Sequence, residues 1–232
     1  MVYVTGDMHG EIQRFRSKAM RCVKKGDTLI ICGDFGFLWD GGRKEQAAQK
    51  KISSLPYRVC FLDGCHENFD LLEEYPVTEW NGGTVHKLSE NLFHLMRGQI
   101  YTIEKNTYFT FGGGHSQDFE YHVEEKHWWR QERPTQQEIQ NAIRNLSDHG
   151  NQVDYILTHE PPASLKDCLG VDVGERLEVH TFFEDMIKAC IYRKWFFGKC
   201  HLNKYVPVKF YALFDAVLPI TIKNTDLRKY GV

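Results

Sequence analysis

The sequence predicts an α/β fold in which one domain, covering residues 1–232, contains two sheets. Three observations favour this class. Short apolar runs of strand length alternate with segments whose apolar residues recur at helical spacing. The strand-like runs end in short polar clusters, as at the carboxyl ends of parallel strands, where α/β proteins build their sites. A length of 232 residues suits one large domain, and no linker or low-complexity tract divides the chain.

The first half of the chain alternates between the two types of element. Strands are predicted at residues 1–5, 28–32 and 57–62, and helices at residues 12–23, 43–54 and 67–75. The first of these helices is indicated by apolar residues at helical spacing, namely Ile12, Phe15, Ala19 and Val23. Alternation of this kind favours βαβ units and a largely parallel sheet.

The second half begins with strands and then returns to alternation. Strands are predicted at residues 92–96, 99–104, 108–112, 153–157, 195–197, 209–214 and 217–222. A helix is predicted at 178–191, and another begins at Thr135, which forms a capping-box pattern with Glu138. Lys105-Asn106 is predicted as a hairpin turn, and the last two strands are candidates for a second hairpin. Residues 113–134 are predicted as a polar loop.

Composition and charge argue against several classes of protein. The 29 Lys and Arg against 31 Asp and Glu give a net charge of −2, which disfavours an extended nucleic-acid surface. No run of about 18 apolar residues is present, so no membrane-spanning helix is expected. The first residues lack the pattern of a secretory signal. Seven scattered cysteines without a C-x-x-C pair indicate reduced thiols, and we expect a cytoplasmic protein.

Polar clusters follow five of the predicted strands. They are Gly6-Asp7-Met8-His9-Gly10, Gly33-Asp34-Phe35-Gly36, Gly64-Cys65-His66-Glu67, Thr158-His159-Glu160 and Gly198-Lys199-Cys200-His201. Glycine lets the chain turn sharply after a strand, so that the next side chain points into the crevice at the sheet edge. Aspartate and histidine together are typical ligands of Zn, Mn, Fe and similar divalent ions. One such cluster would more often be a turn, but five in order predict a metal site.

The order of these clusters resembles that of the calcineurin-like metallophosphoesterases. The family order is GDxHG, GD, GNH(E/D), a lone His after a strand and GHxH; this chain reads GDMHG, GDFG, GCHE, TH and GKCH between residues 6 and 201. The resemblance implies a two-sheet β-sandwich flanked by helices, with the active site at the C-terminal ends of the strands. It implies a first metal held by Asp7, His9 and His201. It also implies that Asp34 bridges both metals and that His159 binds the second.

The resemblance further implies a metal-dependent phosphoesterase that hydrolyses a phosphomonoester or a phosphodiester. A metal-bound hydroxide would attack phosphorus in line, and His66 would contact the phosphate and act as general acid for the leaving group. The substrate would be a phosphorylated small molecule, including nucleotides, and the cofactors one or two ions of Mn, Fe, Zn or Mg. The alternative is a catalytically impaired binding or regulatory protein on the same fold. His66 favours catalysis, because a binding protein needs no leaving-group acid.

Two departures from the family pattern alter the second metal site. Cys65 stands where the family has a metal-binding Asn, and Lys199 stands where it has the first His of GHxH. One explanation is that the charge of Lys199 replaces the second cation and holds a substrate phosphate. A second is that Cys65, as a thiolate, ligates a soft ion such as Zn or Fe. The third is that the second site is lost.

A third departure concerns the orientation of His66. Phe37 stands where many family members have an aspartate that orients the catalytic histidine. Asp40 and Asp63 are the candidates for this role, and the tautomer of His66 depends on which residue fills it.

The loop at residues 113–134 is the candidate for substrate recognition because it is rich in His, Trp and Arg. Its candidate binding residues are His115, Trp128 and Arg130, and it also contains His122, His127, Trp129 and Arg133. Tryptophan with arginine can stack a base and hold a phosphate. The competing interpretation is that the two tryptophans pack the loop onto the body of the protein. Trp39, near Asp34, is likewise either a pocket wall or part of the core.

Overall fold

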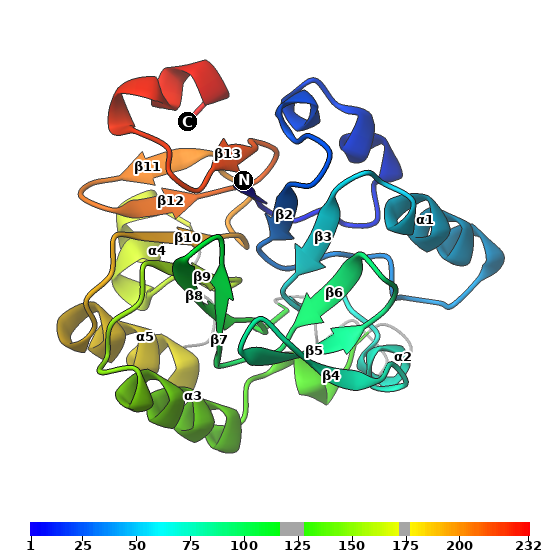
Figure 1. Cartoon of the computed structure of the whole chain (residues 1–232). Helices are drawn as coiled ribbons and strands as arrows, with labels where there is room; N and C mark the ends of the chain where they lie inside the picture. The colour runs from blue at the N-terminus through cyan, green and yellow to red at the C-terminus, as the bar shows by residue number, and fades with distance from the viewer. Residues whose placement is uncertain (117–127, 172–176) are drawn as a thin grey trace.

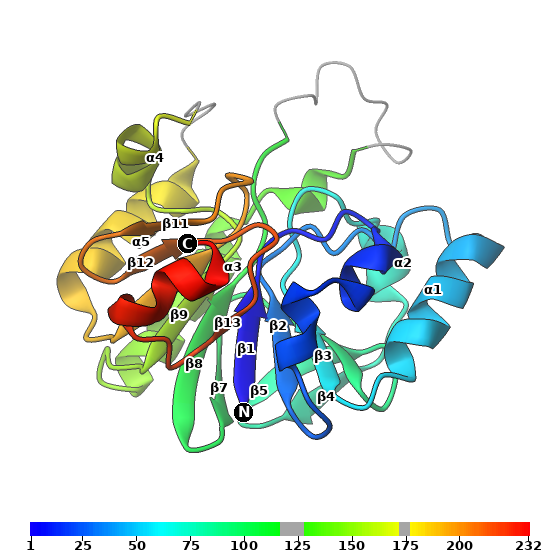
Figure 2. The same cartoon turned by 90° about the horizontal axis from the view of Figure 1, so that it is seen from above.

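Two β-sheets with helices outside them form the computed structural model (Figures 1 and 2), which describes residues 1–116, 128–171 and 177–232. The described residues give a seven-stranded sheet in the spatial order β13 (Leu218–Pro219), β1 (Val2–Thr5), β2 (Thr28–Ile31), β3 (Arg58–Phe61), β6 (Leu92–Leu95), β5 (Gly83–Lys87), β4 (Val77–Trp80). They also give a six-stranded sheet in the order β11 (Lys204–Val206), β12 (Phe210–Ala212), β10 (Lys194–Phe197), β9 (Tyr155–Thr158), β8 (Asn106–Phe111), β7 (Gln99–Ile103). The expected α/β fold with two sheets is confirmed.

Both sheets are parallel at the centre and antiparallel at the edges. Strands β1, β2, β3 and β6 pair in parallel, as do β8, β9, β10 and β12. Antiparallel strands flank them, with β13 and β5–β4 in one sheet and β11 and β7 in the other. Because parallel strands all end at the same edge, the loops that follow them are brought together there.

The helices cover the outer faces of the sandwich (Figure 2). Over the seven-stranded sheet lie the 3₁₀ helices η1 (Ile12–Arg16) and η2 (Ala19–Cys22) and the α-helices α1 (Arg43–Ser53) and α2 (Phe69–Glu73). Over the six-stranded sheet lie α3 (Gln136–Asp148), α4 (Ala163–Leu169) and α5 (Glu178–Ala189). Two further 3₁₀ helices are η4 (Arg130–Glu132) and η5 (Asn224–Tyr230). The longest described helix has 13 residues, and none has both the length and the apolarity needed to cross a membrane.

Apolar side chains fill the space between the sheets and the space beneath the helices. Between the sheets, Val4 and Ile30 of one sheet join Leu157 and Phe196 of the other in one buried cluster. Alternate residues of the same strands point the other way, so that Ile31 packs beneath the outer helices. One sheet therefore separates the central cluster from each outer cluster. Both faces of each sheet are packed with apolar side chains, and the polar site residues lie at the strand ends.

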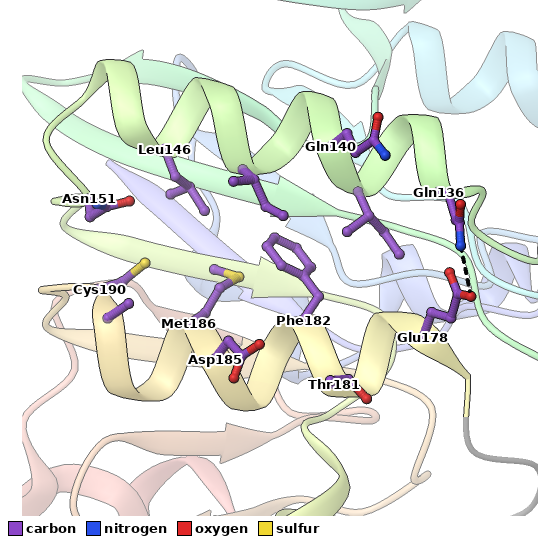
Figure 3. Close-up of a pocket in the computed structure, with 13 residues that line it drawn as sticks. Gln136, Gln140, Leu146, Asn151, Glu178, Thr181, Phe182, Asp185, Met186 and Cys190 are labelled. Carbon is purple, nitrogen blue, oxygen red and sulfur yellow. Dashed lines mark hydrogen bonds between the residues drawn. The ribbon is translucent and has the colours of Figure 1, made fainter.

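Helices α3 and α5 lie side by side over the six-stranded sheet (Figure 3). Leu146 and Phe182 both point into the gap between the two helices, and Gln136 donates a hydrogen bond of 3.0 Å to Glu178 across it. The predicted capping box at the start of α3 is confirmed, because the Thr135 side chain and Glu138 exchange hydrogen bonds with each other's backbone N–H. The groove between these helices has a volume of about 550 Å³, and its lining includes no residue of the five strand-end clusters.

The continuous helix predicted at residues 12–23 is wrong. The segment forms η1 and η2, separated by Ser17 in an extended conformation with ψ of 162°. The buried positions of Phe15 and Met20 are as compatible with two short helical turns as with one continuous helix, so the apolar spacing does not distinguish the two. The guanidinium of Arg14 donates to the backbone carbonyls of Asp7 and Phe214, which ties the segment to the strand-end loops.

The predicted hairpin at the end of the chain is also wrong, because β12 and β13 belong to different sheets. The turn predicted at Lys105-Asn106 is shifted by one residue: Glu104 and Lys105 have φ of 48° and 68°, and Asn106 already pairs with Ile103. Strands β4, β5 and β11 and helix α4 were not predicted. The residues of β4 alternate between exposed and half-buried, so they form no apolar run in the sequence.

Candidate metal centre

The strand-end loops bring six predicted site residues into adjoining positions. Two groups have their potential ligand atoms within 4.8 Å of one another: Asp7, His9, Asp34 and His201 form the first, and Asp34, Cys65 and His159 form the second. Asp34 belongs to both groups. The loops that supply them follow β1, β2, β3, β9 and β10, which all end at the same edge of the sandwich.

Several of these residues have a backbone conformation that side chains rarely adopt. His9, Asp34 and His201 have φ of 47°, 44° and 50°, and Lys199 has φ of 63°. Such conformations cost about 1–3 kcal/mol each and persist where the surrounding structure holds them. Gly33 shows how tightly the loops meet, because a Cβ atom there would lie 2.0 Å from the His159 ring nitrogen Nδ1.

The first group is held together by its two histidines and Asp7. His201 Nε2 lies 3.0 Å from Asp7 Oδ2 and 2.9 Å from His9 Nε2. The hydrogen bond with Asp7 raises the pKa of His201, whereas burial lowers the pKa of His9. The carboxylate of Asp7 is fully buried and also accepts from the backbone N–H of Lys199 at 3.1 Å. Two imidazole nitrogens and two carboxylates facing one another match the ligand preference of Zn, Mn and Fe.

Asp34 is fixed by the backbone that follows β3. The N–H groups of Cys65 and His66 donate to Asp34 Oδ1 at 2.6 Å and 3.0 Å. Burial raises the pKa of the Asp34 carboxyl, but His159, His66 and Lys199 outweigh burial and hold that pKa well below its ordinary value. Asp34 is therefore a buried anion, and its two oxygens face both groups.

The second group contains a histidine with a defined orientation. His159 Nδ1 lies 3.1 Å from the Cys32 carbonyl oxygen, which makes Nδ1 the protonated nitrogen and leaves Nε2 as the free one. Nε2 lies 3.5 Å from Asp34 Oδ1 and 4.0 Å from Cys65 Sγ. This orientation would suit a metal ligand.

Lys199 occupies the edge of this second group. Its ammonium donates to Cys65 Sγ at 3.1 Å and to the His115 carbonyl oxygen at 2.9 Å, and it lies 3.9 Å from Glu160 Oε1. Burial lowers the pKa of Lys199, but the anionic groups around it outweigh burial and raise it. Burial raises the pKa of the Cys65 thiol, and neighbouring carboxylates raise it further against the effect of Lys199. The positive charge of the pair therefore lies on Lys199, and burial disfavours a thiolate at Cys65.

Two buried glutamates support the site and were not singled out from the sequence. Glu67 accepts from the N–H groups of Phe35 and Gly64 at 2.5 Å and 2.7 Å, which joins the loops after β2 and β3. Glu160 lies 2.6 Å from Lys166 Nζ of α4 and 3.2 Å from His180 Nε2 of α5. Each glutamate directly follows a site histidine in the sequence, which is the signal that could have identified both.

His66 lies beside the first group and is half exposed. Its Nε2 is 3.9 Å from Asp34 Oδ2, and its ring centroid is 5.0 Å from that of His9. Asp40 and Asp63, the two candidates for orienting His66, both have other partners. Asp63 accepts from Arg97 Nε at 2.8 Å and lies 3.0 Å from His94 Nε2, while Asp40 accepts from the Gly42 N–H at 2.7 Å.

The loop residues fall into different environments. Trp129 is buried against Trp39 with ring centroids 5.2 Å apart, which confirms that this tryptophan packs the loop onto the body. Trp128 is half-buried. The side chain of His115 is buried, with its Nδ1 3.0 Å from Arg133 Nη2. His115 contacts Lys199 through its backbone carbonyl oxygen. Arg130 is exposed at the start of η4, and none of the described contacts of the two groups involves it. His122 and His127 lie outside the described residues.

The family model described as calcineurin-like phosphoesterase matches residues 1–189. No curated protein matches the chain. The matched residues include four of the five strand-end clusters, and the fifth, with Lys199 and His201, follows them in the sequence and meets them in space.

Proposed function

The chain belongs to the calcineurin-like phosphoesterase family, and we propose that it hydrolyses a phosphomonoester or phosphodiester with His66 as the acid and Lys199 as a built-in cation. The observation that carries this proposal is the shared position of Asp34. Its buried carboxylate faces one group with four potential metal ligands and a second group that has the ammonium of Lys199 at its edge. His66 lies at the open side of the same carboxylate.

We propose that one divalent ion, of Mn, Fe, Zn or Mg, is held by Asp7, His9, Asp34 and His201. When bound, such an ion supplies Lewis-acid chemistry and lowers the pKa of a water molecule. The donor set of the first group fits it, because all four side chains face one another and the two carboxylates are buried. The second group fits a divalent ion poorly, because an ammonium lies 3.1 Å from the sulfur of Cys65.

Lys199 would bind an oxygen of the substrate phosphate. Its ammonium is held by the His115 carbonyl and by Glu160, so it would contribute a charge without a large loss of side-chain freedom. A positive charge at this position neutralises the phosphate and the charge that develops on it during reaction. Of the three explanations for the altered second group, these contacts favour replacement of the cation by lysine.

His66 would give a proton to the leaving oxygen. A general acid of this kind contributes about 10²–10⁴-fold to the rate. The imidazole is half exposed and lies beside the ligand group, where a substrate can reach it. The competing candidate is a binding or regulatory protein with an impaired site, which the altered residues Cys65 and Lys199 would suit. The retained His66 favours catalysis, because binding alone has no use for it.

The substrate would be a phosphorylated small molecule or nucleotide, and the free state of all seven cysteines suits the reducing cytoplasm. The test uses protein freed of metal and reloaded with Mn, Fe, Zn or Mg in turn. Hydrolysis of 4-nitrophenyl phosphate and of bis(4-nitrophenyl) phosphate is then followed. We expect turnover of at least one ester that depends on the added metal. Binding of inorganic phosphate without turnover of either ester, under any of the four metals, would support the binding protein instead.

A further inference from the structure

A cavity of about 520 Å³ opens directly beside His66 and His9. It runs from these two rings to the first turns of α1, where Lys44 and Ala48 line it, and Trp39 forms one of its walls. A volume in this range accommodates a small organic group rather than a single phosphate. The cavity therefore has room for a part of the substrate other than its phosphate group.

Trp39 is held rigidly from several sides. Its backbone carbonyl oxygen accepts from Asn68 Nδ2 at 2.8 Å, and its backbone N–H donates to the Glu45 carboxylate. Behind it, Trp129 packs edge-on with ring centroids 5.2 Å apart, and the Trp129 indole N–H donates to Asp70 at 2.9 Å. The Trp39 side chain stays half-buried, with the cavity on its open side. A wall fixed in advance loses little freedom when a ligand packs on it.

We propose that this cavity binds the leaving group of the substrate and that this group carries a planar aromatic ring packed on Trp39; the inference rests on the proposed function. The leaving group is the part that His66 must protonate, so it lies on the His66 side of the phosphate. His66 and Trp39 are neighbours, with ring centroids 6.1 Å apart and planes inclined at 45°.

The polar groups of the cavity favour an aromatic ring over a sugar. The Glu45 carboxylate already accepts from the N–H groups of Trp39 and Gly41, and Asp40 accepts from that of Gly42. These carboxylates are thus partly used by the backbone, whereas a sugar needs several hydrogen-bond partners. A planar ring needs mainly the face of Trp39. Lys44, exposed at the rim, adds a positive charge for an anionic substituent on that group.

The test compares two substrates that share a carbon skeleton, one with a planar aromatic ring system and one with a saturated, non-planar one. They are 2-naphthylmethyl phosphate and its fully saturated analogue, each also as the methyl diester, so that both release an alkyl alcohol of similar size and acidity. The values of kcat/KM are measured for the wild type and for Trp39→Leu, Trp39→Phe and Trp80→Leu. Trp80 serves as the matched control, because it is also half-buried but packs on Phe93 in β6. Binding of the free alcohol 2-naphthylmethanol is measured by calorimetry.

We expect the ratio of kcat/KM for the aromatic over the saturated ester to fall about tenfold in Trp39→Leu. The ratio should be retained in Trp39→Phe, which keeps a ring, and in Trp80→Leu. Binding of 2-naphthylmethanol should be lost in Trp39→Leu alone. An unchanged ratio in Trp39→Leu, with hydrolysis of both esters, overturns the aromatic subsite and leaves the proposed function intact. Trp39-dependent binding of the alcohol without hydrolysis of any ester supports the subsite and counts against the proposed function.

Discussion

The ammonium of Lys199 lies 3.1 Å from the sulfur of Cys65, at the edge of the group that Cys65 forms with Asp34 and His159. An ammonium and a divalent cation about 4 Å apart repel each other by roughly 8 kcal/mol at an effective dielectric constant of about 20. The contact therefore separates the two groups into one that suits a metal ion and one that already holds a cation.

The first prediction is a metal content of one tightly bound ion per chain. In Lys199→Met the repulsion is removed, and Cys65 can release its proton to solvent when it binds a metal. A second ion, preferably zinc, should therefore bind. Metal content is measured by elemental analysis after removal of loosely bound ions. Lys188→Met is the control, because that side chain is exposed on α5 and should leave the content unchanged. Two tightly bound ions in the wild type would contradict the proposed role of Lys199.

The proximity of the site residues could be predicted because each one follows a strand directly. Asp7, Asp34 and His159 come one to three residues after β1, β2 and β9, and parallel strands end at a common edge. The metal binding itself stays a prediction. The partners of Glu160 could not be predicted, because Lys166 and His180 come from α4 and α5 and reach it through the packing of two helices.

The fold shows the same division between local and long-range information. The central strands are apolar runs with glycine after them, and their existence could be predicted from the sequence. The sheet to which each strand belongs depends on pairings between distant residues. Tyr3 pairs with Pro219 in the seven-stranded sheet, for example, whereas Tyr211 pairs with Phe196 in the six-stranded sheet. The chain therefore changes sheet between residues 212 and 218 with no local signal, and the predicted hairpin there was wrong.

The second prediction concerns proton donation by His66. His66→Ala should lower kcat about 10²–10⁴-fold for an ester with an alkyl leaving group. The loss should be much smaller for 4-nitrophenyl phosphate, because 4-nitrophenolate leaves without a proton. Metal content should stay the same, since His66 is not counted among the ligands. Equal losses with both esters would show that His66 acts in another way, and a loss of metal would place it among the ligands.

The third prediction tests the first ligand group through His201. This side chain is half exposed, so His201→Ala should fold normally while removing one of four ligands. Tight metal binding should be lost, and turnover should fall with it. His149→Ala, which removes an exposed histidine at the end of α3, is the matched control and should change neither quantity. Undiminished metal content in His201→Ala would refute this placement of the ion.

The last prediction concerns stability and pH through Asp63 and Arg97. Burial raises the pKa of the Asp63 carboxyl, but the charge of Arg97 and the hydrogen bond from His94 outweigh burial and hold that pKa well below its ordinary value. The folded state therefore favours ionised Asp63. The pair contributes stability above the unfolded-state pKa of about 3.9, and this contribution is lost as the pH falls towards the folded-state pKa.

Arg97→Leu should destabilise the protein by about 3–5 kcal/mol near neutral pH, because it leaves Asp63 buried and charged without its main partner. In this variant the charge of Arg97 no longer opposes burial, so protonation of Asp63 on acidification relieves part of the cost. The difference in unfolding free energy between wild type and Arg97→Leu should therefore shrink as the pH falls below about 3.9 towards the folded-state pKa of Asp63. Urea unfolding at several pH values measures it, with the exposed Arg228→Leu as control. A difference that stays constant over this range would mean that Arg97 stabilises the fold by packing and not by its charge on Asp63.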